Sequence, residues 1–483
     1  MDITTVNFIV FFLVCIGLYY CVGDRYKNIF LLIASYIFYS QSLPQYLFIL
    51  IVSGLVIYID GLLIEKIARK NAKIALGTGI LFLVIELVLF KYIMFISNLL
   101  RNRLGVNLHI PFAIIQPLGI SFFVLQSISY LIDVWRGDIK ADKNLVNVLL
   151  YTSFFPFILS GPIQKGKEFI PQLQKHKKFN IKQVEYGIIL MSWGYFQKLV
   201  ISNRLALVAN HIFENYNVYS GVILIFGAIV FGIQLYIDFS GYSDIAIGMA
   251  NTFGMNLKKN FQFPYTAQTI AEFWRRWHIS LSSWLKEYVY FPLGGNRRGQ
   301  MRKYFNILVV FCVSGIWHGT GINYLIWGGL HGIYQILGGI TGGVREKIRI
   351  SLGIDEDSEL YKIFRMGIVF LLVDFAWIFF KAPGTHAALI FISRIFPLQL
   401  ENLFNGTLLQ LGLTNIDWYI CIFALFMFEI LHYFRKHTDI WLFLDKQWIG
   451  FRWTLYYALI FSVILFGIYG SNSVSAPFNY FQF

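Results

Sequence analysis

Charged side chains are scarce in this sequence of 483 residues. Asp, Glu, Lys and Arg together make up 14% of it, whereas about 25% is usual in soluble domains. Hydrophobic residues make up 57%, and the mean hydropathy is +0.61. Long apolar runs recur along the whole chain, which is typical of a protein with several membrane-spanning helices. The composition therefore excludes an ordinary soluble domain.

Cysteine is also rare, and several metal-site and catalytic motifs are missing. The four cysteines lie apart from one another in apolar segments, without a C-x-x-C pair: Cys15, Cys21, Cys312 and Cys421. This spacing argues against a disulfide framework, a zinc site and a thiol nucleophile, so we expect packed, inert thiols. The sequence also lacks the H-E-x-x-H motif of zinc peptidases and the G-x-S-x-G motif of serine hydrolases.

Acidic residues are outnumbered by basic ones, 26 to 40, so the net charge is +14. In a soluble protein this excess would suggest nucleic-acid binding. Here the basic residues lie mostly in loops between apolar runs, as in cytoplasmic loops that face anionic lipid. We therefore expect a lipid bilayer as partner and no nucleic acid, and we predict that residues 65–73, 165–182 and 258–303 are cytoplasmic. Residues 344–362 mix both charges and indicate no side.

The apolar runs predict an all-α polytopic protein. A bilayer core of about 30 Å requires about 20 apolar residues per helix. The sequence favours about eleven to thirteen transmembrane or re-entrant helices, at 6–22, 29–43, 45–64, 74–99, 112–133, 145–164, 184–202, 222–247, 305–317, 322–341, 365–381, 416–434 and 453–470. The first run lacks a basic segment before it, so we interpret it as a retained helix. Without internal repeats or a Pro/Ser-rich linker, we predict one membrane domain over 1–483.

Six charged residues fall within or beside these runs, where a charge costs about 2.5–3.5 kcal/mol on insertion scales. They are Asp60, Glu86, Lys91, Asp238, Asp244 and Asp374. For the first three, the simplest interpretation is snorkelling or pairing near helix ends. The others need a partner, a cavity or a function.

Three histidines lie in or near apolar segments of the second half of the chain: His278, His318 and His331. A lone intramembrane histidine is most simply an interhelical hydrogen bond, worth about 0.6 kcal/mol, and we interpret His331 in this way. His318 lies in VSGIWHGTG, which is too rich in glycine for one rigid helix. Irregular backbone at membrane depth is tolerated only where it is buried in protein or lines a cavity.

The residue types around His318 leave general-base chemistry as the main possibility. His278 and His318 lie forty residues apart without further ligands nearby, so we expect no metal. An imidazole can accept a hydroxyl proton near neutral pH if burial keeps it uncharged. That property suits direct transfer of an acyl group to an alcohol, in a site that keeps bulk water from an activated ester.

Five stretches together resemble the membrane-bound O-acyltransferase family, in the branch that contains the alginate O-acetyltransferase membrane subunit. They are PLGISFFVLQSISYLIDVWRG (117–137), FFPFILSGPIQ (154–164), QLYIDFSGYSDIAIGMANTFG (234–254), NFQFPYTAQTIAEFWRRWHISLSSWLKEYVYFPLGGNRRG (260–299) and SGIWHGTGINYLIWGGLHG (314–332). The resemblance implies a catalytic core at about 117–332. It also implies a ring of tilted helices around a thinned centre, with a central tunnel in which donor and acceptor meet.

The same resemblance assigns site residues. His318 corresponds to the family's near-universal histidine, the expected base, and His278 to the second family histidine. Further candidates for the donor or tunnel site are Trp274, Arg275, Arg276, Trp277, Ser282, Lys286, Asp238, Trp317 and Asn323. The cations are expected to hold an anionic donor such as acetyl-CoA or another acyl thioester; anchoring of lipid phosphate is the alternative. Asp238 and Asp244 are expected to pair with these cations. No tightly bound cofactor is expected.

The choice of acceptor depends on the branch. The tail SAPFNYFQF (475–483) and the segment YFPLGGNRRG resemble the alginate-type branch, although Asn479 stands where we expect an aliphatic residue. That branch implies O-acetylation of an exported polysaccharide in a bacterial cell membrane, with an extracytoplasmic acetyltransferase partner. D-alanylation of teichoic acid and acylation of a lipid or protein are alternatives. A transporter or flippase would show two related halves, which we do not see.

Overall fold

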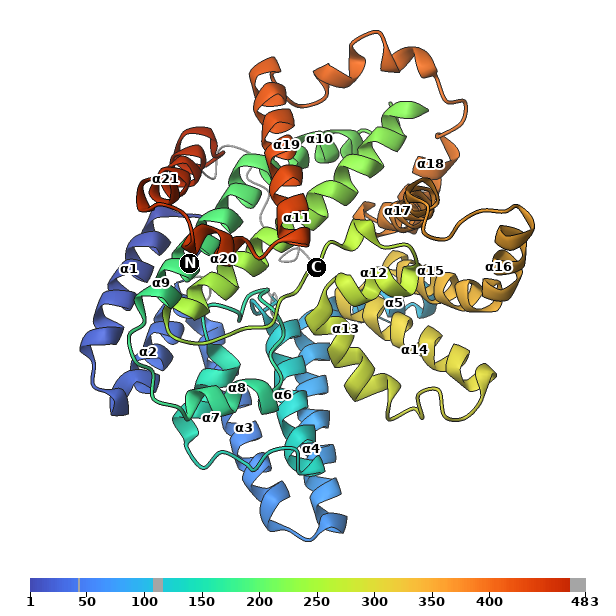
Figure 1. Ribbon diagram of the computed structural model, residues 1–483. Helices are drawn as coiled ribbons and strands as arrows, with labels where there is room; N and C mark the ends of the chain where they lie inside the picture. Colours follow the sequence, from blue (N-terminus) through green and yellow to red (C-terminus); the bar gives the residue numbers. More distant parts are fainter. Residues whose placement is uncertain (42–43, 107–115, 470–483) are drawn as a thin grey trace. The chain divides into compact units, whose positions relative to one another are not determined.

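The computed structural model describes residues 1–41, 44–106 and 116–469, and these residues form helices and no strands (Figure 1). They make up two compact units. The first comprises Met1–Met191 and Ser243–Lys258, and the second Ser192–Tyr242 with Lys259 onward. Helices α9 and α11 pass from one unit into the other. The aromatic tail at 475–483 lies outside the described residues.

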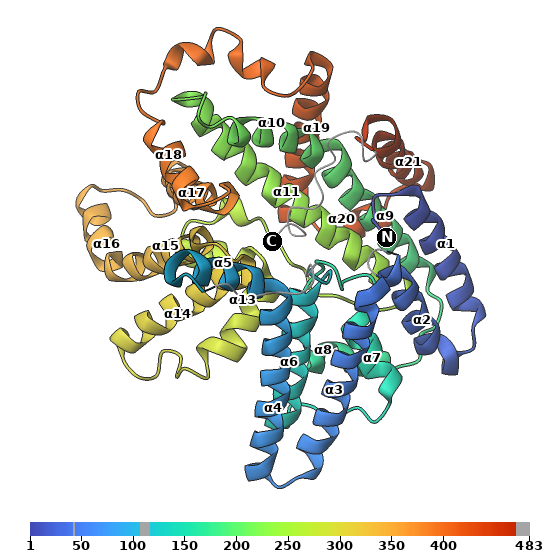
Figure 2. The same ribbon diagram turned by 180° about the vertical axis from the view of Figure 1, so that it is seen from behind.

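The first unit holds the N-terminal helices. Its α-helices are α1 (Val6–Cys21), α2 (Lys27–Ser40), α3 (Leu47–Lys66), α4 (Arg69–Leu87), α5 (Ile93–Leu104), α6 (Ile120–Arg136), α7 (Leu145–Ser153), α8 (Gly166–Leu173) and most of α9 (Ile181–Tyr195). Short turns are η1 (Asp24–Tyr26), η2 (Pro44–Tyr46) and η3 (Val88–Tyr92). Helices α3, α4 and α6 pack together, as both views show (Figures 1 and 2).

Two of the charged residues in this unit are hydrogen-bonded inside the helix packing. Ser53 of α3 donates its hydroxyl to Glu86 of α4 at 2.7 Å, and Lys91 donates to Ser121 of α6 at 3.1 Å. Both charged side chains are buried. Of the two interpretations offered, snorkelling or pairing near helix ends, pairing applies to these two residues, because polar partners on neighbouring helices make burial tolerable.

The predicted span at 145–164 is also wrong. Helix α7 ends at Ser153, and residues 154–165 form turns and bends that are buried throughout. Pro156 and Pro162 lack the backbone N–H that a continuing helix would need, and each disfavours helical geometry in the residue before it. This stretch is the FFPFILSGPIQ motif, so it is irregular buried backbone and not a spanning helix.

The second unit carries the histidines and tryptophans of interest. Its α-helices are α10 (Asn203–Glu214), most of α11 (Val222–Thr252), α12 (Ile270–Arg276), α13 (Ile279–Leu285), α14 (Gln300–His318), α15 (Ile322–Ile340), α16 (Gly342–Ser351), α17 (Glu359–Lys381), α18 (Thr385–Ser393), α19 (Asn415–His437), α20 (Ile440–Asp445) and α21 (Ile449–Phe466). This unit also contains two π-helical segments, η4 (Phe196–Ser202) and η6 (Lys286–Tyr290). Its short 3-10 helices are η5 (Pro264–Thr266), η7 (Leu400–Leu403) and η8 (Thr407–Gln410).

Helices α14 and α15 form a close pair, joined by three residues and visible side by side in both views (Figures 1 and 2). Two glycines allow the close approach. A Cβ on Gly315 would lie 2.3 Å from the backbone oxygen of Tyr324, and one on Gly328 would lie 2.2 Å from that of Phe311. Helix α17 packs against α15 on the same side as α12. This packing holds the two histidine-bearing segments in one unit.

Six helical stretches in the described part of the chain are long and apolar enough to cross a bilayer. They are Pro44–Lys66, Arg69–Asn102, Val222–Thr252, Glu359–Lys381, Asn415–His437 and Ile449–Phe466. Each overlaps a span predicted from the sequence. The chain is thus an all-α, multi-pass membrane protein, and several of the other predicted spans are shorter or interrupted helices.

Candidate active site

His318 is the last residue of α14, and the chain leaves the helix at Gly319 with extended backbone (φ −159°). The partial negative charge at a helix C-terminus stabilises a positive charge placed there. A base at this position therefore gains stabilisation when it takes a proton. The side chain is only 3% exposed.

Aromatic rings surround His318. The ring centroids of Trp317, Trp327 and Phe380 lie 4.8, 5.0 and 5.4 Å from that of His318. Trp327 belongs to α15 and Phe380 to α17, so three helices build this environment. The apolar rings exclude bulk water, which would otherwise compete for a reactive ester.

His278 lies between α12 and α13, outside the six long apolar helices, with φ 42° and ψ 54°. Such left-handed backbone costs a residue with a side chain about 1–3 kcal/mol and is concentrated at functional sites. The side chain is fully buried, and burial lowers the pKa of the imidazole to about 3. His278 is therefore neutral at physiological pH.

Asn260 holds the segment around His278. Its side-chain oxygen lies 3.1 Å from His278 Nδ1 and accepts hydrogen bonds from Ser280 N–H (3.2 Å) and Ser280 O–H (2.9 Å). The Ile279 N–H donates to its backbone oxygen at 2.9 Å. The amide of Asn260 is therefore a side-chain partner of the His278 ring.

The two histidines lie next to each other although forty residues separate them. Their ring centroids are 6.4 Å apart, and that of Trp317 lies 6.1 Å from His278. Phe239 of α11 packs edge-on against His278 at 4.7 Å. The unit thus contains two adjacent buried imidazoles in an aromatic environment, which suits proton transfer without free water.

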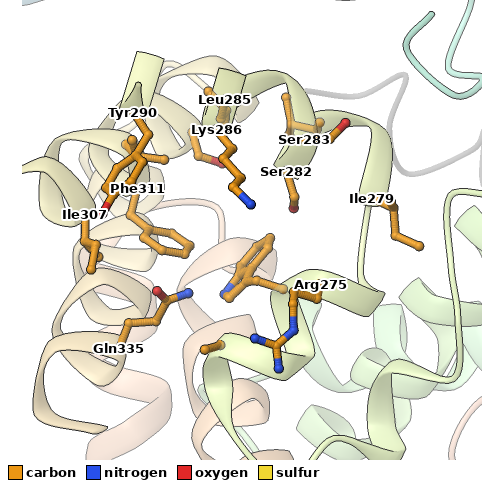
Figure 3. A pocket seen from close by; sticks show the side chains of 15 residues that line it. Arg275, Ile279, Ser282, Ser283, Leu285, Lys286, Tyr290, Ile307, Phe311 and Gln335 are labelled. Atoms are coloured by element: carbon orange, nitrogen blue, oxygen red, sulfur yellow. The ribbon is translucent and has the colours of Figure 1, made fainter. Parts of the chain in front are cut away.

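A cavity of about 390 Å³ lies between α12, α13, α14 and α15 (Figure 3). Its lining includes Trp274, Arg275, Ser282, Lys286 and Ser314, the last one turn before His318 on α14. Lys286 and Ser282 extend into the cavity in Figure 3, as does Gln335 of α15. Four predicted site residues therefore share one cavity.

The two cations of this cavity differ from their neighbour Arg276. Within the described part of the chain, neither Arg275 nor Lys286 forms an ion pair with a carboxylate, whereas Arg276 pairs with Glu272. Arg276 also donates to Thr266 Oγ1 at 2.6 Å. Arg276 therefore ties α12 to η5 and does not line the cavity.

Asp238 pairs with Lys198 of η4 at 2.7 Å, and both side chains are 3% exposed. Ser202 Oγ also donates to Asp238, at 3.1 Å. The prediction that Asp238 pairs with Arg275, Arg276 or Lys286 is therefore wrong. The lysine of a π-helical turn, which no local pattern marks, is its partner.

The remaining predicted residues support the packing. Trp274 donates its Nε1–H to Nδ1 of His331 at 3.2 Å, which confirms the interhelical hydrogen bond expected for that histidine. Trp277 is buried against Trp377 of α17, with centroids 5.1 Å apart. Asn323 donates to the backbone oxygens of Phe379 and Ala382 at 3.0 and 3.3 Å, and so attaches the start of α15 to the end of α17.

The sequence analysis did not single out Asn260, Ser314, Trp327 or Phe380. Asn260 is the first residue of the motif NFQFPY, and Ser314 is the first residue of SGIWHGTG. Their place in motifs that resemble the family was the sequence signal that could have identified them. Phe380 lies in an ordinary apolar run. Only the packing of α17 against α15 brings it to His318.

Comparison with known proteins shows which family and which enzymes this chain is similar to. Residues 138–351 match the membrane-bound O-acyltransferase family. A probable alginate O-acetylase, AlgI, of Pseudomonas putida is 34% identical, and the alignment covers 97% of each chain. A peptidoglycan O-acetyltransferase of Helicobacter pylori is 33% identical over 77% of this chain and 74% of its own. A teichoic acid D-alanyltransferase of Bacillus subtilis is 28% identical over 47% of this chain and 59% of its own.

The extent of the first match, together with the family match, settles the family. The region that matches the family, residues 138–351, contains His278, His318 and the residues that line the cavity. The chain belongs to the membrane-bound O-acyltransferase family, in its alginate O-acetylase-like branch, and is an O-acyltransferase.

Proposed function

We propose that this protein moves an acetyl group from a cytoplasmic thioester donor, acetyl-CoA in the simplest case, across the membrane toward hydroxyls of an exported or cell-surface polysaccharide. It would act in the cytoplasmic membrane of a bacterium. The pairing of His318 and His278, 6.4 Å apart and buried, is the observation that carries the proposal. Relatives named as a probable alginate O-acetylase and a peptidoglycan O-acetyltransferase support the polysaccharide acceptor.

The chemistry needs one base and no covalent enzyme intermediate. His318 removes the proton of the acceptor hydroxyl while its oxygen attacks the thioester carbonyl carbon. A new C–O bond forms, the C–S bond breaks, and the proton passes from the imidazolium to the departing thiolate. The position of His318 at the end of α14 favours the transient positive charge.

The cavity beside α14 supports a donor site. Arg275 and Lys286 supply positive charge for an anionic donor, and the apolar wall formed by Trp274 and Phe311 suits its uncharged portion. Ser314 lies in the same wall, one turn from His318. A thioester held here would have its reactive end near the base.

An extracytoplasmic acetyltransferase that completes transfer to the polymer is part of this proposal. D-alanylation of teichoic acid is the second candidate. It is favoured less because the teichoic acid relative aligns over only 47% of this chain, against 97% for the alginate relative.

The test is to measure the esters that mild alkali releases from the surface polymers of cells lacking this chain and of cells expressing His318→Ala. We expect acetate to fall to background in both, while the variant still accumulates in the membrane. His386→Ala, a change at an exposed histidine of α18, is the matched control and should retain acetate.

Other results would point elsewhere. Loss of D-alanine in place of acetate would move the protein to the second candidate. Unchanged levels of both esters in the deletion strain would point to a different acceptor, a lipid or a protein. Full activity of His318→Ala would overturn the assignment of the base.

A further inference from the structure

The hydrogen bonds around Asn260 determine which nitrogen of His278 carries a proton. The Ser280 backbone N–H can only donate, so the Asn260 side-chain atom that it faces at 3.2 Å must be the amide oxygen. The same oxygen lies 3.1 Å from His278 Nδ1. Because an amide oxygen only accepts, Nδ1 must be the protonated nitrogen.

A competing arrangement would have the Ser280 hydroxyl donate to His278 Nδ1. Their separation is 3.5 Å, whereas the hydroxyl lies 2.9 Å from the Asn260 oxygen. The shorter contact takes the hydroxyl proton. In the neutral ring, Nε2 then carries the in-plane lone pair that can accept a hydrogen bond or a proton.

The backbone is arranged to keep this contact. Ile279 N–H donates to Asn260 O at 2.9 Å, so the main chains on both sides are joined next to the side-chain bond. His278 has left-handed backbone at φ 42°. This geometry is unfavourable for a residue with a side chain and persists only where the surrounding contacts stabilise it. Three successive residues, His278, Ile279 and Ser280, thus bond to a single asparagine.

We propose that Asn260 is a positioning residue of the acyl-transfer site, which fixes His278 in the Nδ1-protonated tautomer, so that Nε2 can act only as an acceptor of a hydrogen bond. A ring-centroid separation of 6.4 Å from His318 is too long for a direct hydrogen bond between the two imidazoles. His318 is the titratable neighbour in ring contact with His278. That the site transfers an acyl group rests on the proposed function; the tautomer does not.

The first test is spectroscopic and independent of activity. The full chain, labelled with ¹⁵N-histidine and placed in lipid vesicles, should show one imidazole with protonated Nδ1 and unprotonated Nε2 that is missing from His278→Gln. This signal should stay unchanged between pH 5 and pH 8, because His278 is already neutral. A His278 signal with unprotonated Nδ1 overturns the proposal, even if no variant at Asn260 folds.

Asn260→Asp gives a matched change in charge. A carboxylate accepts the same hydrogen bonds but favours the positively charged ring, so it raises the pKa of His278. The His278 signal should then become doubly protonated as the pH falls through the range in which the unmodified protein stays neutral. An unchanged spectrum would contradict direct contact between the two side chains.

The second test measures activity. Asn260→Ala should lower polymer-bound acetate on the order of 10-fold or more, because the imidazole loses the partner that holds its tautomer and orientation. Asn306→Ala is the control, because Asn306 is equally buried and also holds a loop, by donating to Gly295 O at 2.8 Å. If both alanine variants lose acetate only in proportion to folded protein, Asn260 has a structural role alone.

The two proposals fail in different ways. Retained acetate in His318→Ala removes the proposed base but leaves the His278 spectrum as a test of Asn260. Wild-type acetate in Asn260→Ala, with no acetate in His318→Ala, removes only the positioning role.

Discussion

Two histidines with the same side chain have different backbone settings, and these settings suit different tasks. His318 ends a helix of nineteen residues, where developing positive charge is stabilised. His278 lies between two helices of seven residues each, where Asn260 fixes its ring. Both histidines were identifiable from the sequence. Asn260 was not, because the two residues lie eighteen positions apart in the sequence and no local pattern predicts their contact.

Neighbouring arginines differ in the same way. Arg275 lines the cavity, whereas Arg276 is engaged with Glu272 and Thr266. The sequence analysis treated them alike, since a helix of seven residues does not reveal which face meets the cavity. The direction of each guanidinium follows from the packing of α12 against α15 and η5.

This difference predicts unequal effects of neutral substitutions. Arg275→Gln should raise the acetyl-CoA concentration for half-maximal acetylation about three- to tenfold, by loss of about 0.7–1.4 kcal/mol of charge attraction. Arg276→Gln should instead lower the thermal stability of the protein. The acetyl-CoA concentration for half-maximal acetylation, measured on the protein that remains folded, should stay unchanged. Inverted membrane vesicles with acetyl-CoA as the probe allow both measurements. Equal shifts for the two variants would show that the cavity does not hold the donor.

At the scale of helices, the predicted boundaries were most accurate for long apolar runs that contain no proline. The predicted run at 322–341 compares with α15 at Ile322–Ile340, and that at 416–434 lies inside α19. The failure at 145–164 had an identifiable cause in Pro156 and Pro162. Hydropathy alone cannot separate a spanning helix from buried irregular backbone, because both are apolar.

The α14–α15 pair offers a matched test of close packing. Gly328→Ala would place a Cβ 2.2 Å from a backbone oxygen, whereas the adjacent Gly329 has nothing within 4 Å. Overpacking of this kind costs about 1–3 kcal/mol, and backbone cannot move aside as a side chain can. We expect Gly328→Ala to lower the melting temperature of the purified protein and Gly329→Ala to leave it equal or higher, since alanine favours helix. Identical melting temperatures would mean that the helices are farther apart.

At the scale of the whole molecule, we interpret the net charge of +14 as a signal of orientation in the membrane and not of nucleic-acid binding. The excess of Lys and Arg in short loops predicts the cytoplasmic face. The chain's two basic stretches at 65–73 and 258–303 are therefore expected on the same side of the membrane.

Cysteine labelling checks this orientation. In a variant without the four native cysteines, Lys70→Cys and Arg298→Cys should react with a membrane-impermeant maleimide only after the cells are opened, because both positions are exposed and predicted to be cytoplasmic. Asp2→Cys, which lies just before the start of α1 at Val6, provides a labelling position outside the two basic stretches for comparison. Labelling of only one of the two basic-loop positions in intact cells would contradict the predicted topology.

The sequence by itself determined the membrane class, most of the long helices, the family and the two histidines. Those features follow from composition, hydropathy and residue order, which are local properties of the chain. Only the tertiary structure decided that His278 lies beside His318, that Asn260 fixes it, that Asp238 pairs with Lys198, and that Arg275 and Arg276 differ. Each of these depends on contacts between segments distant in sequence, and a single sequence carries no direct record of such contacts.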